Sequence, residues 1–477
     1  MKFGDLFKAA NPFGNKGGLI AGLFVLLQGS ALQMALGLLA SVLRVRVLGA
    51  EWFGKTAFLI TILAVLPTTY DLFNDTLLRF YRESEGSTKK RLFIFSLLSK
   101  LLFYIVIGVG VLAFVLLWNA GGTAPALNDP ALRIFFLFYL AGILFDLFRT
   151  TLLIILKSEG HYGRFVAVTA IESLLGTCFA ALLLWAGVHG RDAVAWLGGY
   201  VLVNSVAQLG IVSWLVVSQT TFRHWIGKSM GPFWRSMRFV FGRYFRPYSL
   251  PQSPAILFAY IKKNVGTIVL GSSAGFEQVT YYKILMRIVD VILSLVPRSA
   301  QAMLPAVIEA RKRSEEEFEK KYLRLGRYYL LGSGAISLAL YFAAPVLFRL
   351  YGLRLGPEVV PVVLILCLLL HQHALAFLVN FLYNMSATRW PTYFMIPTTN
   401  AVYIVSLILL APFGLLGVAL AHLLQRTAGT VMHAYFGVLR LKVLSLASFT
   451  RFALMTAGIS LLLVLLHFAR SLSGRLW

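Results

Sequence analysis

The chain has 477 residues, of which 58% are hydrophobic and only 13% are charged. A soluble domain has about 25% charged residues, so this composition excludes an ordinary soluble enzyme and indicates a polytopic membrane protein. The apolar runs are long and do not alternate, which favours helices over a barrel. We assign most of the net charge of +25 to basic cytoplasmic loops and not to nucleic-acid binding.

The apolar runs predict about thirteen membrane helices, with 12 to 14 as the range that uncertain helix ends allow. In the first half we expect helices at 19–42, 56–81, 92–118, 131–156, 165–188 and 193–218. In the second half we expect helices at 244–270 (broken by prolines), 279–303, 322–348, 359–385, 392–412 and 415–439, followed by one extra helix at 452–468. The first run begins near Gly18 and is too long for a signal peptide, so we interpret it as a spanning helix.

The connecting segments define the expected domain organisation. A basic, aromatic stretch at 219–243 is predicted to be an amphipathic linker at the membrane interface, between an N-terminal bundle at 1–218 and a C-terminal bundle at 244–439. Residues 440–477 hold the extra helix. The stretch ARKRSEEEFEKK after residue 309 is predicted to be a charged loop. The excess of Lys and Arg on one side places the N-terminus in the cytoplasm.

The strongest functional pattern is a polar stripe on the helix at 279–303. Its members are spaced three or four residues apart and fall within a sector of about 80°; they are Lys283, Arg287, Asp290, Ser294, Arg298 and Gln301. Because a charge in mid-bilayer costs roughly 2.5 kcal/mol or more, such a stripe should face a cavity or a partner. Lys283 and Arg298 lie near the helix ends, so snorkelling to the interface is the alternative for these two.

Other charged residues lie in neighbouring helices. Lys262 and Lys263 are adjacent, so only one of them can face a cavity. Asp71 and Asp75 lie one turn apart on a helix face that also carries Arg79. These carboxylates, with Asp290 and Glu172, could bind a coupling proton or sodium ion, or could simply neutralise nearby cations. For Glu172 we favour a structural role.

The histidines do not predict a metal site. His422, Gln425, Arg426 and His433 share one face of the helix at 415–439. Of these, His422 and Arg426 are candidates for a secondary cavity lining, together with Arg79 and Gln301. His371 and His373 point to opposite sides of their helix, and the ligand set is incomplete for a metal ion. The cysteines, Cys178 and Cys367, lie in apolar runs and predict neither a disulfide nor a metal centre.

Residues 49–56, GAEWFGKT, match the phosphate-loop pattern of nucleotide-binding proteins. The segment that follows is a lipid-type apolar helix, and no soluble α/β domain surrounds it. We therefore interpret the stretch as a tight glycine turn between two helices. No nucleotide, cofactor or catalytic group is expected, and the chain is not predicted to be an enzyme.

Three stretches carry a family resemblance. SVLRVRVLGAEWFGKTAFLITILAVLPTTYDLFNDTLLRFY near the start is echoed by VLGSSAGFEQVTYYKILMRI and YGLRLGPEVVPVVLILCLLLHQHALAFLVNFLYNMSATRW in the second half. The chain resembles the polysaccharide-type flippases of the multidrug/oligosaccharidyl-lipid/polysaccharide exporter superfamily. The resemblance implies an all-α fold of two pseudo-symmetric six-helix bundles around a central cavity. It also implies export of an undecaprenyl-pyrophosphate-linked oligosaccharide.

These observations predict a monomeric flippase of the cytoplasmic membrane that works by alternating access. Lys262, Lys263, Lys283, Arg287 and Arg298 are expected to hold the substrate pyrophosphate. A cation-coupled multidrug exporter and a peptidoglycan-precursor flippase of the same superfamily are the alternatives. A membrane glycosyltransferase would need a large external loop, and the longest one here, at 119–130, is too short.

Overall fold

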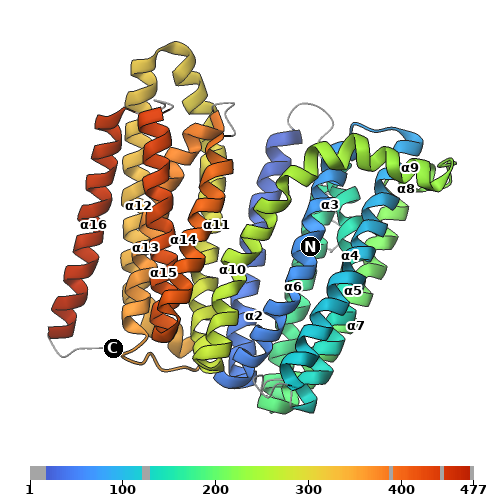
Figure 1. The fold of residues 1–477 in the computed structure, drawn as a ribbon, viewed down its shortest axis with the longest axis horizontal. Coiled ribbons are helices and arrows are strands. Elements are labelled where there is room, and N and C mark those ends of the chain that lie inside the picture. The colour runs from blue at the N-terminus through green and yellow to red at the C-terminus, as the bar shows by residue number, and fades with distance from the viewer. Residues whose placement is uncertain (1–17, 121–128, 386–389, 441–444, 473–477) are drawn as a thin grey trace, which may run out of the picture. The chain divides into compact units, whose positions relative to one another are not determined.

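The computed structural model describes residues 18–120, 129–385, 390–440 and 445–472, and within these ranges the chain is built from helices (Figure 1). It divides into two compact units, Met1–Ile268 and Val269–Trp477. We call them the first and the second unit and describe each by itself. The all-α class predicted from the apolar runs is confirmed.

The first unit contains the longer run of helices. They are α2 (Gly18–Leu63), α3 (Val65–Tyr81), α4 (Gly86–Ala120), α5 (Pro130–Ser158), α6 (Tyr162–Trp185), α7 (Gly190–Gln219), α8 (Phe222–Ile226), α9 (Phe233–Val240), the π-helix η2 (Phe241–Ser249), the 3-10 turn η3 (Leu250–Gln252) and most of α10 (Ser253–Ser273). Helices α5 and α7 pack along each other, as do α2 and α6. The α5–α7 contact depends on Gly198, because a Cβ there would lie 2.9 Å from Cα of Phe135.

The second unit repeats the bundle plan with fewer elements. They are α11 (Phe276–Arg313), α12 (Glu315–Leu350), α13 (Val360–Met385), α14 (Trp390–Leu410), η4 (Ala411–Phe413), α15 (Gly414–Ala434), η5 (Tyr435–Arg440) and α16 (Leu446–Leu472). Helices α14 and α15 form a hairpin, and α13 packs against both α12 and α15. The extra C-terminal helix predicted from the sequence is α16, which packs on α12 and α13.

By length and composition, eight helical segments of the described chain could cross a membrane. They also leave large apolar side chains exposed, such as Leu102 and Val106 on α4 and Leu454 and Leu461 on α16, as a lipid-facing surface requires. The chain is therefore a multi-pass membrane protein. Helices α3, α10 and α11 are not among the eight, and they carry many of the charged residues discussed below.

Two expected loops are wrong in extent. The predicted turn near residues 48–56 is a single non-helical residue, Gly49, inside α2, with a φ of 75° that favours glycine. In the segment that matches the phosphate-loop pattern, Lys55 pairs with Glu51 and the Thr56 hydroxyl donates to the carbonyl of Phe53 at 2.9 Å. Both side chains therefore bond to groups of the same helix. The segment is helical where a nucleotide site would need a strand followed by a loop.

The predicted charged loop after residue 309 is also helical. Helix α11 continues to Arg313, and α12 begins at Glu315. Ser314 alone separates them and caps α12, because its hydroxyl accepts a hydrogen bond from the Glu317 amide at 3.0 Å. Charged side chains suit an exposed helix as well as a loop, and the Ser-x-x-Glu spacing is a capping signature.

Candidate functional site

A polar cavity of about 320 Å³ lies inside the first unit. It is bordered by α3, α5 and α10 and lined by Ala64, Pro67, Thr68, Tyr70, Asp71, Asn74, Asp146, Thr150, Lys263 and Asn264. Two carboxylates and one ammonium group therefore share one space. The buried Tyr70 hydroxyl has no hydrogen-bond partner among the described residues, so a bound group or water would satisfy it.

Lys100 of α4 lies behind this cavity and is fully buried, with 0% of its surface exposed. Its ammonium donates to the Thr151 hydroxyl at 2.7 Å and to the side-chain oxygen of Asn74. Asp71 and Asp146 act on it electrostatically without a direct contact. A buried charge is costly unless it is hydrogen-bonded, and here neutral oxygens supply the hydrogen bonds. Lys100 thus links α4 to α3 and α5 behind the carboxylate side of the cavity.

A buried arginine joins Asp146 to a further carboxylate, that of Glu172. The Arg149 guanidinium donates to Asp146 at 2.6 Å from Nε and also forms an ion pair with Glu172. Asp146 and Arg149 lie on α5, whereas Glu172 lies on α6, so the ion pairs connect two helices. The Asp146 carboxylate therefore faces the cavity and also accepts from Arg149, which holds it in place.

The residues predicted in the first unit are only partly brought together. Asp71 and Lys263 line the same cavity. Asp75 is exposed and does not line it, and Lys262 is half-buried. Arg79 is exposed, with its guanidinium 4.4 Å from the centre of the Tyr248 ring. Only one of the adjacent lysines thus reaches this cavity, as the 100° step between neighbouring positions requires.

In the second unit the stripe on α11 has the two faces that its spacing predicts. Arg287 and Asp290 are exposed and Lys283 is half-buried, whereas Ile284 and Val289 are buried. The side chains of Arg298 and Gln301 lie outside the described part of the chain. The helix itself is continuous through these positions. A cationic group therefore projects from a helix whose opposite face is packed.

His422 belongs to a buried hydrogen-bonded cluster. Its Nε2 atom lies 2.7 Å from the Tyr282 hydroxyl and 3.1 Å from the Tyr403 hydroxyl. One turn further along α15, Gln425 donates to Asn400 at 3.4 Å. Arg426 is half-buried on the same helix. These contacts join α11, α14 and α15, so His422 packs inside the second unit instead of lining an open surface.

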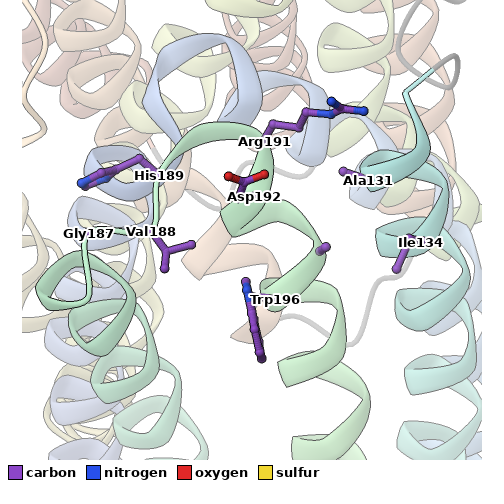
Figure 2. A pocket seen from close by; sticks show the side chains of 9 residues that line it. Ala131, Ile134, Gly187, Val188, His189, Arg191, Asp192 and Trp196 are labelled. Atoms are coloured by element: carbon purple, nitrogen blue, oxygen red, sulfur yellow. The ribbon is translucent and has the colours of Figure 1, made fainter.

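A second, open hollow of about 580 Å³ lies at the other end of the first unit. Figure 2 shows Asp192 and Trp196 on one helix of its wall, Ala131 and Ile134 on the helix across from them, and His189 on the turn. The Arg191 guanidinium above it pairs with Asp129 at 2.8 Å. The hollow is mainly a gap between the start of α5 and the α6–α7 turn.

Sequence analysis missed three charged residues: Lys100, Asp146 and Arg149. Each is an ionisable residue within a long apolar run, which by itself indicates a functional or paired group in a membrane. That signal was present in the sequence. Of the pairings, only Asp146 with Arg149 has a helical spacing, three residues on α5. The other partners, Asn74 and Thr151 of Lys100 and Glu172 of Arg149, lie on other helices and have no spacing that predicts the contact.

No protein-family model matches the chain, and a search of curated proteins finds no match. Solved structures do resemble it. One is described as an inward-facing conformation of a multidrug resistance MATE family transporter of the MOP superfamily, with TM-score 0.64, 15% identity, and coverage of 92% of this chain and 98% of that one. Another is lipid II flippase MurJ in an inward closed conformation, with TM-score 0.63, 14% identity, and coverage of 94% and 99%.

An outward-facing conformation of a multidrug resistance MATE family transporter of the MOP superfamily is also similar, with TM-score 0.55, 14% identity, and coverage of 96% and 99%. At these identities the likeness concerns the fold. The chain therefore has the helical architecture that these transporters and flippases share, over nearly its whole length. This is the fold that the family resemblance of the sequence implies.

Proposed function

We propose that the protein flips a polyprenyl-pyrophosphate-linked oligosaccharide across the cytoplasmic membrane by alternating access, as a monomer with its N-terminus in the cytoplasm. In this proposal it binds and releases its substrate unchanged. The fold of the MATE and MurJ structures supports a transport role. The resemblance of the sequence to polysaccharide-type flippases supports the glycolipid class.

The observation that carries the proposal is the exposure of two cations, one in each unit. Lys263 lies on the polar cavity of the first unit, and Arg287 is exposed on α11 of the second. An exposed cation at membrane depth is expensive unless an anion or a wet cavity faces it. A pyrophosphate offers several oxygens to Lys and Arg, and charge-assisted hydrogen bonds of this kind are the strong ones. Lys262, Lys283 and Arg298 remain proposed members of the same headgroup site.

The carboxylates favour a second candidate, a cation-coupled multidrug exporter. Asp71 and Asp146 both line the first-unit cavity, and an organic cation or a coupling ion would suit them better than a phosphate would. In the flippase these residues would bind a coupling proton or Na⁺, together with Asp75, Asp290 or Glu172. A peptidoglycan-precursor flippase differs from our proposal only in the glycan headgroup.

The test is binding of undecaprenyl pyrophosphate, with and without a glycan, to purified full-length protein in nanodiscs. We expect Arg287→Ala to weaken binding about 10-fold or more, because a hydrogen bond to a charged group contributes about 1.5–3 kcal/mol. Arg327→Ala is the matched control, since Arg327 is exposed on α12. Unchanged binding in Arg287→Ala would reject the headgroup site. Binding of an organic cation that is lost in Asp71→Asn would favour the exporter.

A further inference from the structure

The segment from Phe222 to Leu250, which contains α8, α9, η2 and the first residue of η3, is unusually basic. No Asp or Glu occurs anywhere between Asp192 and Glu277. Six cations of the segment are exposed: Arg223, Lys228, Arg235, Arg238, Arg243 and Arg246. Within the part of the chain that the structure describes, none of the six forms an ion pair. Of the six, only Arg243 lies over aromatic rings of the described chain, those of Phe239 and Tyr244, so the charge of the other five is not used to hold the fold together.

The segment is nevertheless fixed to the first unit, and it packs against α4 and α7 (Figure 1). The Trp225 ring is buried, and its Nε1 donates to the Tyr81 hydroxyl at 3.0 Å. Two side chains of α4 donate to backbone carbonyls of the segment: Arg91 to Met230 at 3.1 Å and Lys90 to Lys228 at 2.8 Å. The two α4 side chains bond to backbone carbonyls of the segment, so the segment's own cations remain available to bind an external ligand.

The α9 helix shows two distinct faces. Ser236 and Val240 are buried against the bundle. On the other side, Trp234 is 81% exposed, and Arg235 and Arg238 are exposed beside it. Because successive positions differ by about 100°, the large aromatic ring and the two guanidiniums share the outward half of the helix. This mixture of exposed Trp and Arg is typical of a helix lying in a membrane interface.

The location of the segment agrees with this. It begins three residues after the end of α7, a helix long and apolar enough to cross a membrane. The Phe222–Leu250 segment therefore starts at a membrane surface. Exposed aromatic side chains, including Phe233 and Phe241, would be poorly placed in bulk water but well placed among headgroups and the first acyl carbons.

We propose that this outward face binds the phosphate groups of anionic phospholipids, with Trp234 as an apolar anchor and Arg235 and Arg238 as phosphate ligands. The argument rests on charge complementarity: six exposed cations without ion pairs face an interface whose anionic lipids are attracted by such clusters. The site is separate from the proposed transport cavity and does not depend on the transported substrate. Since the segment is bonded to α4 and α3, bound lipid would hold the first unit at one depth in the membrane.

The experiment uses the full-length protein in detergent and native mass spectrometry with increasing phosphatidylglycerol or phosphatidylcholine. We expect the wild type to prefer phosphatidylglycerol, and Arg235→Gln with Arg238→Gln to weaken that binding at least about fivefold. The charge-retaining pair Arg235→Lys with Arg238→Lys should keep most of the preference. Arg324→Gln with Arg327→Gln is the matched control, because these two arginines are also exposed and three residues apart on α12.

The proposal is overturned if the wild type binds both lipids equally. It is also overturned if the Arg235 and Arg238 substitutions leave the preference unchanged, or if the control pair lowers it equally. Because all four arginines are exposed, the variants should fold, and an unchanged unfolding temperature checks this. Higher salt should weaken the wild-type preference, since screening shortens the reach of surface charges.

Discussion

The two units stabilise their interiors with different polar groups. In the first unit, Lys100 and Arg149 are buried, and they are the only Lys or Arg residues in the buried class among the side chains that the structure describes. In the second unit the described buried polar groups are neutral or imidazole, as in the cluster of Tyr282, Tyr403 and His422. Two bundles with the same helical plan thus carry charge in different places: inside the first, and on exposed positions of α11 in the second.

The two kinds of buried group should have different roles. Charged groups beside a cavity can bind an ion, whereas neutral hydrogen-bonded groups mainly hold helices together. The charged cluster of the first unit borders a cavity, and its carboxylates can exchange a partner for a proton or a cation. The tyrosine–histidine cluster lines neither of the two cavities described above. We therefore expect substitutions in the charged cluster of the first unit to affect both stability and ion binding, and those in the tyrosine–histidine cluster of the second unit to affect mainly stability.

The largest effect is expected at Arg149. Arg149→Met leaves the carboxylates of Asp146 and Glu172 without their cation, and breaking a buried ion pair by removing one partner costs about 3 kcal/mol. The free energy of unfolding, measured by denaturant titration in mixed micelles, should fall by about that amount. Adding Glu172→Gln should recover part of the loss, because one unpaired carboxylate is then neutral.

The control in the other unit is Tyr282→Phe, which removes one neutral hydrogen bond to His422 and should cost about 1 kcal/mol. If Tyr282→Phe destabilises the protein as much as Arg149→Met does, the contrast between the two units is wrong. A loss in Arg149→Met that Glu172→Gln does not reduce would show that packing of the long side chain, and not charge, accounts for the effect.

A smaller effect, from packing alone, is expected where α12 meets α16. A Cβ at Gly326 would lie 2.3 Å from the ring of Phe452, which is fully buried. Gly326→Ala should therefore lower the free energy of unfolding by about 2 kcal/mol, as overpacking does. Gly332→Ala on the same helix meets open space and should not lower the free energy of unfolding, because alanine is the better helix former by about 1 kcal/mol. Similar losses in both variants would contradict close packing at Gly326.

The periodicity of α11 was enough to predict its two faces. The spacing of Arg287 and Asp290 placed them opposite Ile284 and Val289, and the structure exposes the first pair and buries the second. Such a prediction needs only the helical repeat and the cost of burying charge. It works because both faces belong to one continuous helix.

The contacts of the buried charges in the first unit could not be predicted from helical periodicity. Lys100, Asn74 and Thr151 lie on three helices, and their contact is decided by how those helices pack. The helix start at Glu315 is a different case, because Ser314 and Glu317 carry the capping signal in the sequence itself. The charged composition of that stretch favoured a loop, whereas the capping pair Ser314 and Glu317 predicts a helix that starts there.

The smallest effect is expected at Glu159, which tests charge in the first unit outside its membrane-spanning helices. The Glu159 carboxylate accepts from the Tyr81 hydroxyl at 2.7 Å and from the Thr221 amide at 2.8 Å. Burial alone would raise the pKa of Glu159, but the hydrogen bonds from Thr221 and Tyr81 and the charge of Lys89 together lower it below its ordinary value of 4.5. A carboxyl group with a lowered pKa in the folded state adds stability above pH 4.5, and loses it as the pH falls through the lowered pKa.

We therefore expect Glu159→Gln to cost about 1 kcal/mol near neutral pH, since the carboxylate is partly exposed and its interactions are screened. The difference in unfolding free energy between wild type and Glu159→Gln should shrink as the pH falls below 4.5, because the protonated wild-type side chain then resembles the amide. Denaturant titrations of both proteins between pH 7 and pH 3.5 measure it, and taking the difference cancels the other carboxylates. A difference that stays constant over this range would mean that shape at this turn matters and charge does not, and charge would then stabilise the first unit only in its interior.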